Sequence, residues 1–524
     1  MRKRFSLKLF LGTAFVLFAF FLADPLGIQT NGPFQPQTAH AGFFDSDLDA
    51  FEEVLELVSD NYVYPPDYKK LFTATLDAMI LLLEKEPLII TPVHSGKTLE
   101  VHGHRFSYRL NFNREDNMQA LRGAYDFLHK EFPGKASKKK LEEAGITGLM
   151  DSLDPYSVYM DPEEFESSMR DTEGQYGGVG LVITMVDYRL TVVRVIRNSP
   201  ADRAGVLPDD IITRVDGQEI KGLQIQELAS KLRGYPNTQV NIDVFRPSTK
   251  TTQYTTLTRE IISIETVEYK NLGNKTGYIK ISSFSKQTDS QLEDALEKGI
   301  QDGVEAFILD LRDNPGGLLS QSVKVASHFL EEGKLIVYTQ GRDRHDRQTY
   351  ESIYNDRWNH RPLAVLINGH SASASEIVAG SLKDSGKALV LGERSYGKGS
   401  VQTIFRMSGG AGMRLTTSKY YTPSGIDITT HGILPEIIIE RDITGLPDDP
   451  LMEKSKNAPK PVHPPIAVKE SDIQKFLQKQ GEAQDEDTDL LIAFAQRALR
   501  NLPQPNKSHA LAKARELAKN IQHY

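Results

Sequence analysis

No cysteine occurs among the 524 residues, and no long run of basic residues is present. Without cysteine the chain cannot form a disulfide, use a thiol nucleophile or bind zinc through thiolates. The formal net charge is −8 and the pI about 6.0, so nucleic acid is not an expected partner. The thirteen histidines form no His-Glu-x-x-His pair, which leaves a zinc peptidase unsupported. We therefore expect neither a metal nor an organic cofactor.

Long apolar runs are also scarce, and the one that stands out lies near the N-terminus. The basic start Met1-Arg2-Lys3-Arg4 is followed by an apolar run over residues 9–23 and by Ala39-His40-Ala41. A run this short is typical of an export signal with a small-x-small cleavage site. We expect residues 1–41 to be removed and the mature protein to reach the periplasm or cell envelope. An uncleaved membrane anchor stays open, because a bilayer can thin around a short apolar segment.

The segment 42–165 is expected to be a mainly helical scaffold. Apolar residues recur at helical spacing over residues 51–58, and residues 76–83 form a second apolar stretch. Residues 88–112 are rich in Thr, Val, His and Gly, and they predict a strand pair inserted between helices.

Residues 166–255 predict a compact β-rich module, because short apolar stretches alternate there with Gly and Asp turns. Ser199-Pro200 has the pattern of a helix N-cap followed by proline in the first helical position. The remaining expected elements are strands at 181–185, 190–195 and 211–215, a helix at 225–232 and a final strand through 240–244.

Residues 256–442 predict an α/β core. Continuous apolar runs such as Phe307–Leu311 and Leu363–Ile367, with helices after them, indicate parallel strands covered on both faces. The tail, residues 443–524, begins as a Pro- and Asp-rich linker. In it only residues 490–499 and 510–521 have helical spacing.

Three familiar short signals fail on their context. Gly392 to Gly399 resembles a phosphate-binding loop, but its last position is not Ser or Thr and no helix is expected after it. The pattern Ser395-x-x-Lys398 belongs to penicillin-binding enzymes, yet its companion motifs lie in other expected domains and in the wrong order. His370 lies too close in sequence to Ser373 to be expected as its base, and we interpret it as a loop residue.

A serine-rich turn carries the strongest chemical signal. The buried strand at residues 363–367 is followed by Ser373, which opens a helix ending near Gly386. A serine at a strand-to-helix junction lies beside unpaired helix N–H groups that can stabilise a developing oxyanion. From these residues alone, the alternative that Ser371, Ser373 and Ser375 are only competing helix caps stays open.

Lys398 lies in a glycine-rich loop after an expected strand at residues 388–391. A lysine can act as a general base only when neutral, which requires burial to lower its pKa. Gln402 follows four residues later on an expected strand, so an even offset would place its amide on the same face to orient the amine. An exposed loop lysine is the alternative.

The pattern around these residues resembles the C-terminal processing peptidases, also called tail-specific or carboxyl-terminal proteases, of the S41 type. The resemblance covers the chain from about Gly148 to Glu440. Tyr156 stands where the family has His, Glu436 stands where it usually has Asp, and residues 85–140 hold extra material. The motifs that carry the resemblance are Leu153-Asp154-Pro155-Tyr156-Ser157, Gly178-Val179-Gly180-Leu181, Ser199-Pro200-Ala201 with Ala204-Gly205, Leu309 to Gly317, Ser371 to Ile377, and Gly397 to Gln402.

The resemblance implies a role for individual residues. The family's nucleophile is the middle serine of its motif, 25 positions before the lysine, and Ser373 has this spacing to Lys398. The family's glutamine, four positions after the lysine, is Gln402. The resemblance implies that the oxyanion is bound by the amide of Ala374 and by one glycine amide of the loop, that of Gly316 or Gly317.

The resemblance also implies the architecture and the partner. The expected fold is α/β multidomain, with a helical N-terminal scaffold, a PDZ module, a crotonase-like α/β serine peptidase core and a helical C-terminal tail. The expected partners are proteins or peptides with apolar C-terminal tails, which add as a strand to the PDZ module. An adaptor protein and a homo-oligomer stay open. The backbone amides expected to capture the tail carboxylate are those of Gly178, Val179, Gly180 and Leu181.

We therefore expect an exported serine endopeptidase that cuts proteins near their C-terminal tails through an acyl-enzyme. One rival is a PDZ-bearing adaptor with a degenerate peptidase fold, against which the presence of Ser373, Lys398 and Gln402 argues. A second is an amidase or transpeptidase that uses the same pair on cell-wall peptides. The PDZ module favours protein tails over cell-wall peptides as the substrate.

Overall fold

The computed structural model describes most of the chain beyond residue 47. The described ranges are 48–440, 465–480, 489–502 and 507–522, with gaps in the first at 84–87, 94–95, 136, 173–174, 187–188, 221–222, 224, 264, 357 and 359–360. The export signal predicted at residues 1–41 lies outside them, as does the linker expected to begin at residue 443. Among the helices of these ranges, none has the length and apolarity needed to span a bilayer.

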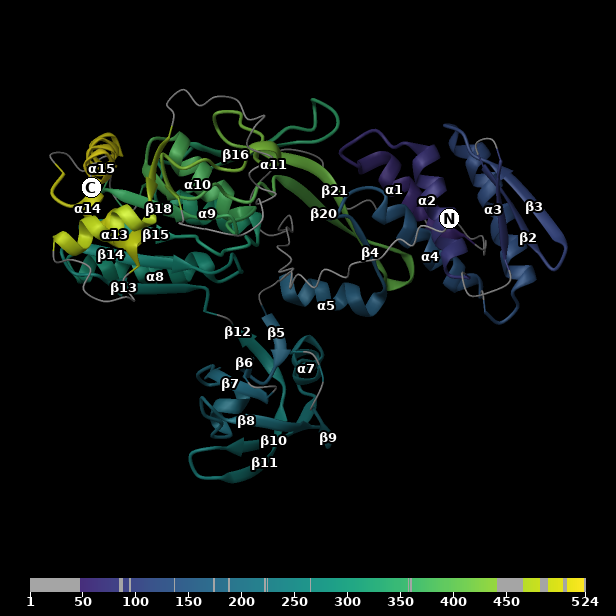
Figure 1. Cartoon of the computed structure of the whole chain (residues 1–524), viewed down its shortest axis with the longest axis horizontal. Helices are drawn as coiled ribbons and strands as arrows, with labels where there is room; N and C mark the ends of the chain where they lie inside the picture. Colours follow the sequence, from purple (N-terminus) through teal and green to yellow (C-terminus); the bar gives the residue numbers. More distant parts are fainter. Residues whose placement is uncertain are drawn as a thin grey trace, which may run out of the picture.

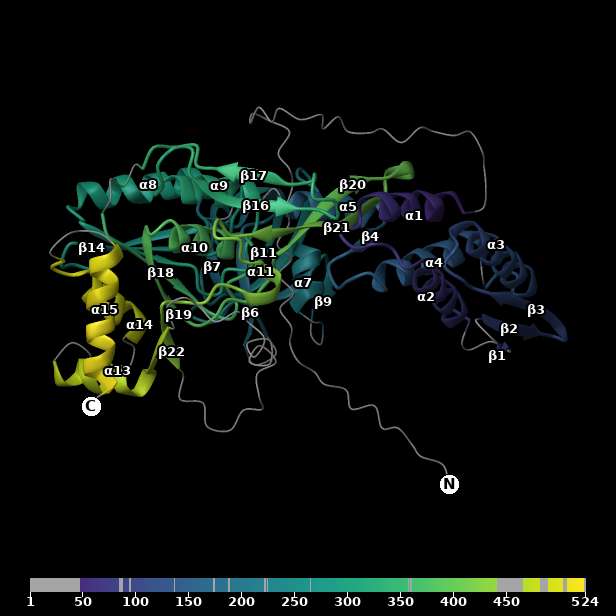
Figure 2. The same cartoon turned by 90° about the horizontal axis from the view of Figure 1, so that it is seen from above.

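The molecule has a central α/β core flanked by other parts (Figure 1). The N-terminal helices and the C-terminal helices lie at opposite ends of its long axis, and a β-rich module hangs below the middle. Figure 2 shows the same end-to-end order from above. The expected helical regions, β-rich module and α/β core are thus all present.

The N-terminal region packs four helices with a small antiparallel sheet, in the order β1-β2-β3. Asp67, Asn113 and Ser137 cap the second, third and fourth helices through their side-chain oxygens. The prediction of a strand pair at 88–112 was one strand short, because β1 is a fully exposed edge strand with no alternation to mark it. The bounds are α1 Asp49–Asn61, α2 Tyr68–Leu81, β1 Ile89–Val93, β2 Gly96–Val101, β3 His104–Arg109, α3 Arg114–Glu131 and α4 Lys138–Asp151.

A long hairpin of strands β20 (Ser400–Arg406) and β21 (Gly412–Tyr421) joins the core to this N-terminal region. Its tip contributes Met407, Met413 and Leu415 to the N-terminal hydrophobic core. The other half of β21 pairs with β16 of the core. Because β20 begins two residues after Lys398, the hairpin connects the N-terminal core directly to the predicted base.

The β-rich module lies where a PDZ domain is expected, and its sheet has the order β11-β10-β8-β7-β6. Ser199 caps α6 as predicted, accepting a hydrogen bond from the Asp202 amide. The bounds are α5 Pro162–Thr172, β5 Gln175–Gly178, β6 Leu181–Val186, β7 Arg189–Val195, α6 Pro200–Arg203, β8 Ile211–Val215, β9 Gln218–Glu219, α7 Ile225–Leu232, β10 Gln239–Arg246, β11 Thr251–Thr258 and β12 Glu260–Ser263.

Two sequence expectations about this module need correction. The strand through 240–244 is not its last, because β11 follows and pairs with β10 along its whole length. The expected boundaries after residues 165 and 255 fall inside α5 and β11. β11 was missed because its Thr-rich, mostly exposed sequence carries almost no apolar signal.

The core is built on a seven-stranded sheet of order β13-β14-β15-β18-β19-β22-β23, parallel except for β13. Strands β15, β18 and β19 are buried throughout, as their continuous apolar runs predicted. The bounds are β13 Val267–Asn271, β14 Thr276–Ile281, α8 Thr288–Gln301, β15 Ala306–Asp310, α9 Leu319–Ser327, β18 Leu363–Ile367, α10 Ala374–Asp384, β19 Ala388–Gly392 and β22 Ile437–Glu440.

A second, smaller sheet carries the hairpin, in the order β17-β16-β21-β20 with β4 paired to β21. The remaining bounds are β4 Val158–Met160, β16 Leu335–Gln340, β17 Gln348–Glu351, the 3-10 turn η1 Ser408–Gly410 and α11 Ile428–His431.

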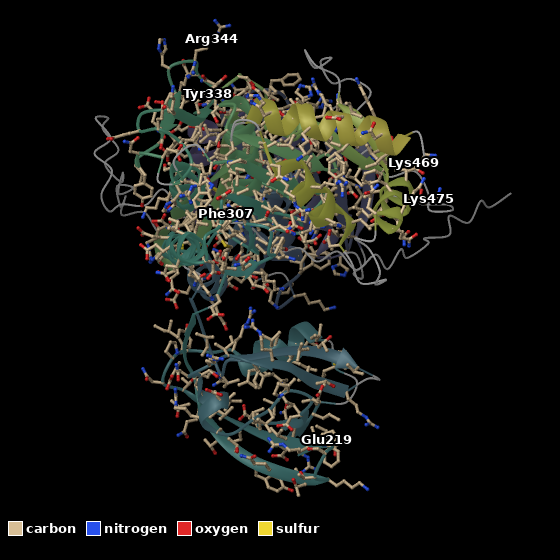
Figure 3. The ribbon with its side chains drawn as sticks, turned by 90° about the vertical axis from the view of Figure 1, so that its left-hand side faces the viewer. Glu219, Phe307, Tyr338, Arg344, Lys469 and Lys475 are labelled. Atoms are coloured by element: carbon tan, nitrogen blue, oxygen red, sulfur yellow. The ribbon has the colours of Figure 1, made fainter. Side chains whose placement is uncertain are left out.

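The C-terminal region is part of the core. β23 (Ile466–Lys469) adds the seventh strand, and α13 (Glu470–Lys479), α14 (Leu490–Leu499) and α15 (Lys507–Gln522) pack on one face of the sheet. Helices α8, α9 and α10 cover the opposite face, so the core has three layers. Figure 3, viewed from this end, shows Lys469 and Lys475 at the outer edge of the C-terminal layer. The prediction of only two helical segments in the tail missed α13.

Candidate active site

Ser373 lies where the predicted strand-to-helix junction places it. Strand β18 ends at Ile367, and Ser373 immediately precedes α10. Its backbone has φ +58° and ψ −113°, a conformation that side-chain-bearing residues rarely adopt. The residue is fully buried. A strained, buried serine at a helix start is a typical feature of a functional site.

The three serines of the motif differ in what their hydroxyl groups do. Ser371 donates to the Leu311 carbonyl at 2.8 Å, and Ser375 donates to the Asn314 carbonyl at 2.9 Å. The buried Ser373 hydroxyl has no hydrogen-bond partner among the described residues. Ser371 and Ser375 are thus held in structural bonds, while the Ser373 hydroxyl is left for other chemistry.

Glu376 joins the serine segment to the lysine segment. It is fully buried, and its Oε2 accepts hydrogen bonds from the amides of Ser373 (2.7 Å) and Lys398 (2.9 Å). Its Oε1 accepts from the Ser395 hydroxyl (2.5 Å) and the Gly397 amide (2.7 Å). Burial raises the pKa of Glu376 to about 6, although the four donors oppose this shift. One carboxyl group therefore fixes both predicted catalytic segments.

Glu376 had no predicted role. The signal that could have found it is the Ser-x-x-Glu spacing from Ser373 to Glu376, which is the pattern of a helix capping box. That pattern predicts the bond from the Ser373 amide to the glutamate, but not the three bonds from the distant lysine loop.

Lys398 is partly buried beside aromatic and cationic side chains. Its Nζ lies 5.0 Å from the centroid of the Tyr156 ring. Burial, together with the nearby positive charge of Arg414, lowers the pKa of Lys398 to about 8, while Glu376 acts in the opposite direction. A substantial fraction of the amine is therefore neutral near pH 8. The expected desolvation of Lys398 is present, and the alternative of an exposed loop lysine is wrong.

Gln402 is buried on β20, but the even-offset argument for it was wrong. Lys398 precedes the first residue of β20, so strand alternation does not extend to it. The register shift beside Gln402 skips Thr417 of β21 and no residue of β20. The Gln402 Nε2 donates to the hydroxyl oxygens of Ser400 at 2.8 Å and Thr416 at 3.4 Å.

These contacts link Gln402 to the Asp154 motif. The Thr416 hydroxyl donates to Asp154 Oδ1 at 3.1 Å, and the same carboxylate accepts from the amides of Tyr156 and Ser157. Asp154 thereby holds the turn that carries Tyr156 next to Lys398. The motif at residues 153–157 is a support for the lysine side of the site.

The glycine loop packs directly on the serine. A Cβ atom at Gly316 would lie 2.9 Å from Ser373 Cβ and 3.0 Å from the Ala374 amide nitrogen, so only glycine fits there. The Gly316 amide donates to Asn314 Oδ1 at 2.9 Å. Gly317 has φ +147° and packs against the backbone of Phe284. Ala374 is the first residue of α10, where helix amides lack intrahelical partners.

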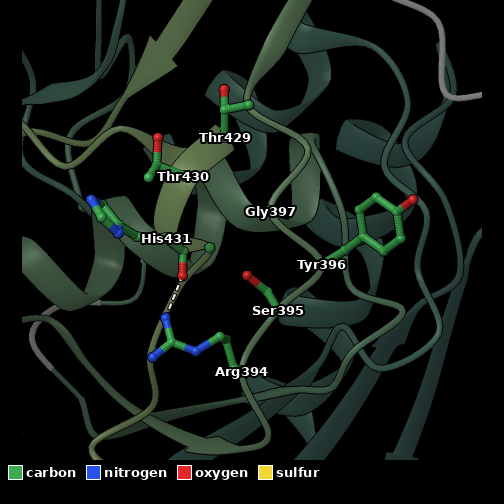
Figure 4. A pocket seen from close by; sticks show the side chains of 8 residues that line it. Arg394, Ser395, Tyr396, Gly397, Thr429, Thr430 and His431 are labelled. Atoms are coloured by element: carbon green, nitrogen blue, oxygen red, sulfur yellow. Dashed lines mark hydrogen bonds between the residues drawn. The ribbon is translucent and has the colours of Figure 1, made fainter. Parts of the chain in front are cut away.

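A small hollow lies beside the lysine loop, between residues 394–397 and residues 429–432 (Figure 4). Arg394 spans it and donates to the His431 carbonyl. The Ser395 hydroxyl also accepts a bond from the Ile433 amide at 2.6 Å, so the hollow is the outer side of the Glu376 network.

His370 and the PDZ loop complete the predicted residues. His370 is an exposed loop residue, as interpreted. In the PDZ module, Gly180 has φ +80°, and its contact with Ser199 leaves no room for a Cβ atom. Leu181 begins β6, the edge strand of the sheet. Within the described ranges, no three His, Asp or Glu side chains cluster as metal ligands do.

Family models match three segments of the chain. Residues 275–439 match the model of peptidase family S41, residues 191–246 match a PDZ domain, and residues 94–164 match the N-terminal domain of the activating protease CtpB. The third match covers much of the extra material at residues 85–140.

Curated proteins of known family are similar to this chain, and so is one solved structure. A carboxy-terminal-processing protease of Bartonella bacilliformis is 40% identical over 323 residues, which are 61% of this chain and 72% of that protein. A "Probable CtpA-like serine protease" of Staphylococcus aureus is 37% identical over 63% of this chain and 66% of its own length. The solved photosystem II D1 C-terminal processing protease is 26% identical, covers 75% of this chain and 93% of its own, and has a TM-score of 0.43. By its sequence matches, this chain belongs to the carboxy-terminal-processing proteases of peptidase family S41, which are serine proteases.

Proposed function

We propose that this chain is an endopeptidase that cuts protein substrates near their C-terminal tails through an acyl-enzyme on Ser373. The observation that carries the proposal is the convergence of Ser373 and Lys398 on Glu376, together with a Ser373 hydroxyl that has no partner among the described residues.

In the first step the Ser373 oxygen attacks the carbonyl carbon of the scissile bond, and the neutral amine of Lys398 takes the hydroxyl proton. The resulting ammonium group returns that proton to the leaving amine as the C–N bond breaks. Water then attacks the ester, Lys398 accepts its proton, and the acid product leaves as Ser373 is protonated again.

The oxyanion is assigned to the Ala374 amide and to one glycine amide of the loop. Gly316 lies against Ser373, but its amide donates to Asn314 Oδ1 and must leave that acceptor before it can serve; the Gly317 amide is the alternative donor. Gln402 is assigned a positioning role on the lysine side, acting through β20 and Thr416.

The PDZ module is assigned the capture of the substrate tail. β6 is an edge strand and can accept an added strand, and α7 packs beside it. Amides of the loop Gly178, Val179, Gly180 and Leu181 would hold the terminal carboxylate. An apolar last side chain would enter between strand and helix.

We also place the mature protein outside the cytoplasm, in the periplasm or cell envelope. The support is the basic start, the apolar run and the Ala39-His40-Ala41 site of the first 41 residues. Protein or peptide substrates with apolar tails are the proposed partners, and an adaptor or a second copy is compatible with this role.

The test compares three substrates that differ only at the end: one protein ending in Ala-Ala, the same protein amidated, and one ending in Asp-Asp. Amidation removes a bond to a charged group, so cleavage should slow roughly 10- to 100-fold. Cleavage of the protein ending in Asp-Asp should slow by a comparable factor, because a charge would enter an apolar pocket. Wild type is run beside Ser373→Ala, with a cell-wall peptide as the substrate of the rival amidase.

The matched variant removes the PDZ module at its neck. β5 and β12 pair side by side, with Gly178 opposite Glu260, so residues 179–259 can be replaced by a short Gly-containing turn. This variant should lose discrimination among the three tails. Equal cleavage of all three by the intact enzyme contradicts the PDZ role, and cleavage of the cell-wall peptide alone contradicts the endopeptidase.

A further inference from the structure

The C-terminal region contacts the glycine loop through one ion pair. Arg312 Nη2 lies 2.7 Å from Asp489 Oδ2, although the two residues are 177 positions apart. Asp489 is also the N-cap of α14, because its Oδ1 accepts from the amides of Leu491 and Ile492 at 3.1 Å. One carboxylate therefore both caps a helix outside the matched peptidase segment and holds a side chain inside it.

Arg312 is fixed from its other side by a fully buried carboxylate. Its Nε lies 3.0 Å from both oxygens of Asp310, and the Tyr278 hydroxyl donates to Asp310 Oδ2 at 2.8 Å. Burial alone would lower the pKa of Arg312, but its bonds to Asp310 and Asp489 outweigh burial and raise it above the usual range. The guanidinium is thus a permanent cation held between two carboxylates.

Arg312 stands at the point where β15 becomes the glycine loop. The next residue, Asp313, exchanges hydrogen bonds with the Asn368 side chain, and the Asn314 carbonyl accepts from the Ala372 amide. Two residues later, Gly316 is in contact with Ser373. The position of Arg312 therefore sets how the loop meets the serine.

We propose that Asp489 is a positioning residue for catalysis, through which the C-terminal region holds the glycine loop in place against Ser373. The inference rests on the proposed function, because the loop supplies the second oxyanion donor. Asp489 touches no reacting atom. It acts by fixing Arg312, and a loop that drifts by a fraction of an ångström donates poorly to the oxyanion.

Two substitutions separate the two bonds of Asp489. Asp489→Ser keeps an oxygen that can cap α14 but is too short to reach Arg312. Asp489→Glu keeps a carboxylate within reach of Arg312 but is not a favoured N-cap residue. Asp67→Ser is the matched control, because Asp67 caps α2 in the N-terminal region and forms no part of the site.

The measurements are kcat and KM for a peptide substrate, the melting temperature, and the affinity of a peptide boronate that forms a tetrahedral adduct with Ser373. For Asp489→Ser we expect kcat about fivefold lower, KM within about twofold, boronate affinity reduced in step with kcat, and an unchanged melting temperature. Asp489→Glu should retain most of its kcat while melting earlier. Asp67→Ser should match wild type in kcat and boronate affinity.

The inference is overturned if Asp489→Ser keeps wild-type kcat and boronate affinity, or if activity follows the melting temperature across the three variants. It is also overturned if Asp489→Glu loses as much kcat as Asp489→Ser. If the Ser373→Ala variant still hydrolyses the peptide and the wild type does not bind the boronate, the proposed function is overturned. This inference is then overturned with it.

Discussion

At the scale of single residues, the free hydroxyl of Ser373 leads to the first prediction. Ser373→Ala should remove nearly all turnover, on the order of 10³-fold or more, and the double variant with Lys398→Ala should be scarcely slower, because the pair acts as one proton-transfer unit. Ser371→Ala and Ser375→Ala should keep substantial turnover. Lys398→Ala alone should lose as much turnover as Ser373→Ala, and steady-state kinetics on one peptide substrate compares the five variants.

Thermal unfolding supplies the control for this series. Ser371→Ala and Ser375→Ala each remove one of the two donors of a buried carbonyl, which keeps its backbone donor, so each should cost about 0.5–1.5 kcal/mol of folding free energy. Ser373→Ala breaks no hydrogen bond and should unfold no earlier than wild type. Multiplicative losses in the double variant, or a dead Ser371→Ala, would refute the assignment of the pair.

The second residue-scale prediction concerns pH. Because the base must be neutral, kcat/KM should be low in acid and rise with pH through an apparent pKa of about 8. Burial is the main cause of this value and the charge of Arg414 adds to it, so Arg414→Met should raise the pKa of Lys398 and move the limb to higher pH.

Arg406→Met is the matched control, since Arg406 is an exposed arginine at the end of the same strand β20 that follows the base. Its pH profile should coincide with that of wild type. A profile that is flat between pH 6 and 9, or a limb that Arg414→Met leaves in place, would exclude Lys398 as the titrating base.

The sequence predicted the local patterns of the site but not the contacts between its distant segments. The spacing between Ser373 and Lys398 and the strand-to-helix junction were readable, because both are local patterns. The parity argument for Gln402 failed because Lys398 lies in the loop before β20, where strand alternation does not apply, and the sequence does not mark where the strand begins. The contacts of Glu376 were unreadable for a different reason, since they depend on how two separate loops approach in space.

At the scale of elements, Glu376 fastens the start of α10 to the loop that carries Lys398, which gives the third prediction. In Glu376→Gln an amide NH₂ replaces one acceptor and faces two donors, so the two segments should separate. Each bond to the charged group is worth about 1.5–3 kcal/mol, and kcat should fall about 10- to 100-fold. Steady-state kinetics at constant pH, with unfolding curves as a check on folding, measures this loss.

Glu436→Gln is its matched control. Glu436 is also a largely buried carboxylate that accepts a backbone amide, from Val390 at 2.7 Å, but it lies on the far side of β19 from the site. It should change kcat little while lowering stability. Equal effects of the two substitutions on kcat would mean that Glu376 has no special role in joining the segments.

Among the elements, the central strands of the core sheet could be predicted from the sequence, whereas β23 at its edge and helix α13 could not. Strands β15, β18 and β19 are continuous apolar runs, which only a strand buried on both faces needs. β23 has only four residues, and α13 carries three buried side chains, so each signal is too short to stand out from the linker before it. Their places are set by tertiary packing on the rest of the core.

At the scale of the whole molecule, the two ends of the chain reach the site by different routes. The N-terminal core holds the tip of the β20–β21 hairpin, where the Ser408 amide donates to the Glu53 carboxylate. The C-terminal region holds the glycine loop through Asp489. The PDZ module is joined at the β5–β12 neck and keeps its own hydrophobic core.

The last prediction follows from this difference in attachment: truncation after residue 442 should destroy the core, whereas loss of the PDZ module should not. Without β23, α13, α14 and α15, one whole face of the sheet, including Ile308, Leu366 and Leu391, would meet water. Each such side chain is worth about 1.5–3 kcal/mol when buried, and a domain has only about 5–15 kcal/mol of stability in total. The ion pair of Glu436 with Lys507 would be lost as well.

The truncated chain should therefore be insoluble or bind a hydrophobic dye without a cooperative unfolding transition, while the variant with residues 179–259 replaced should stay soluble and unfold cooperatively. A soluble truncated chain with a cooperative transition would show that the C-terminal layer is dispensable for folding.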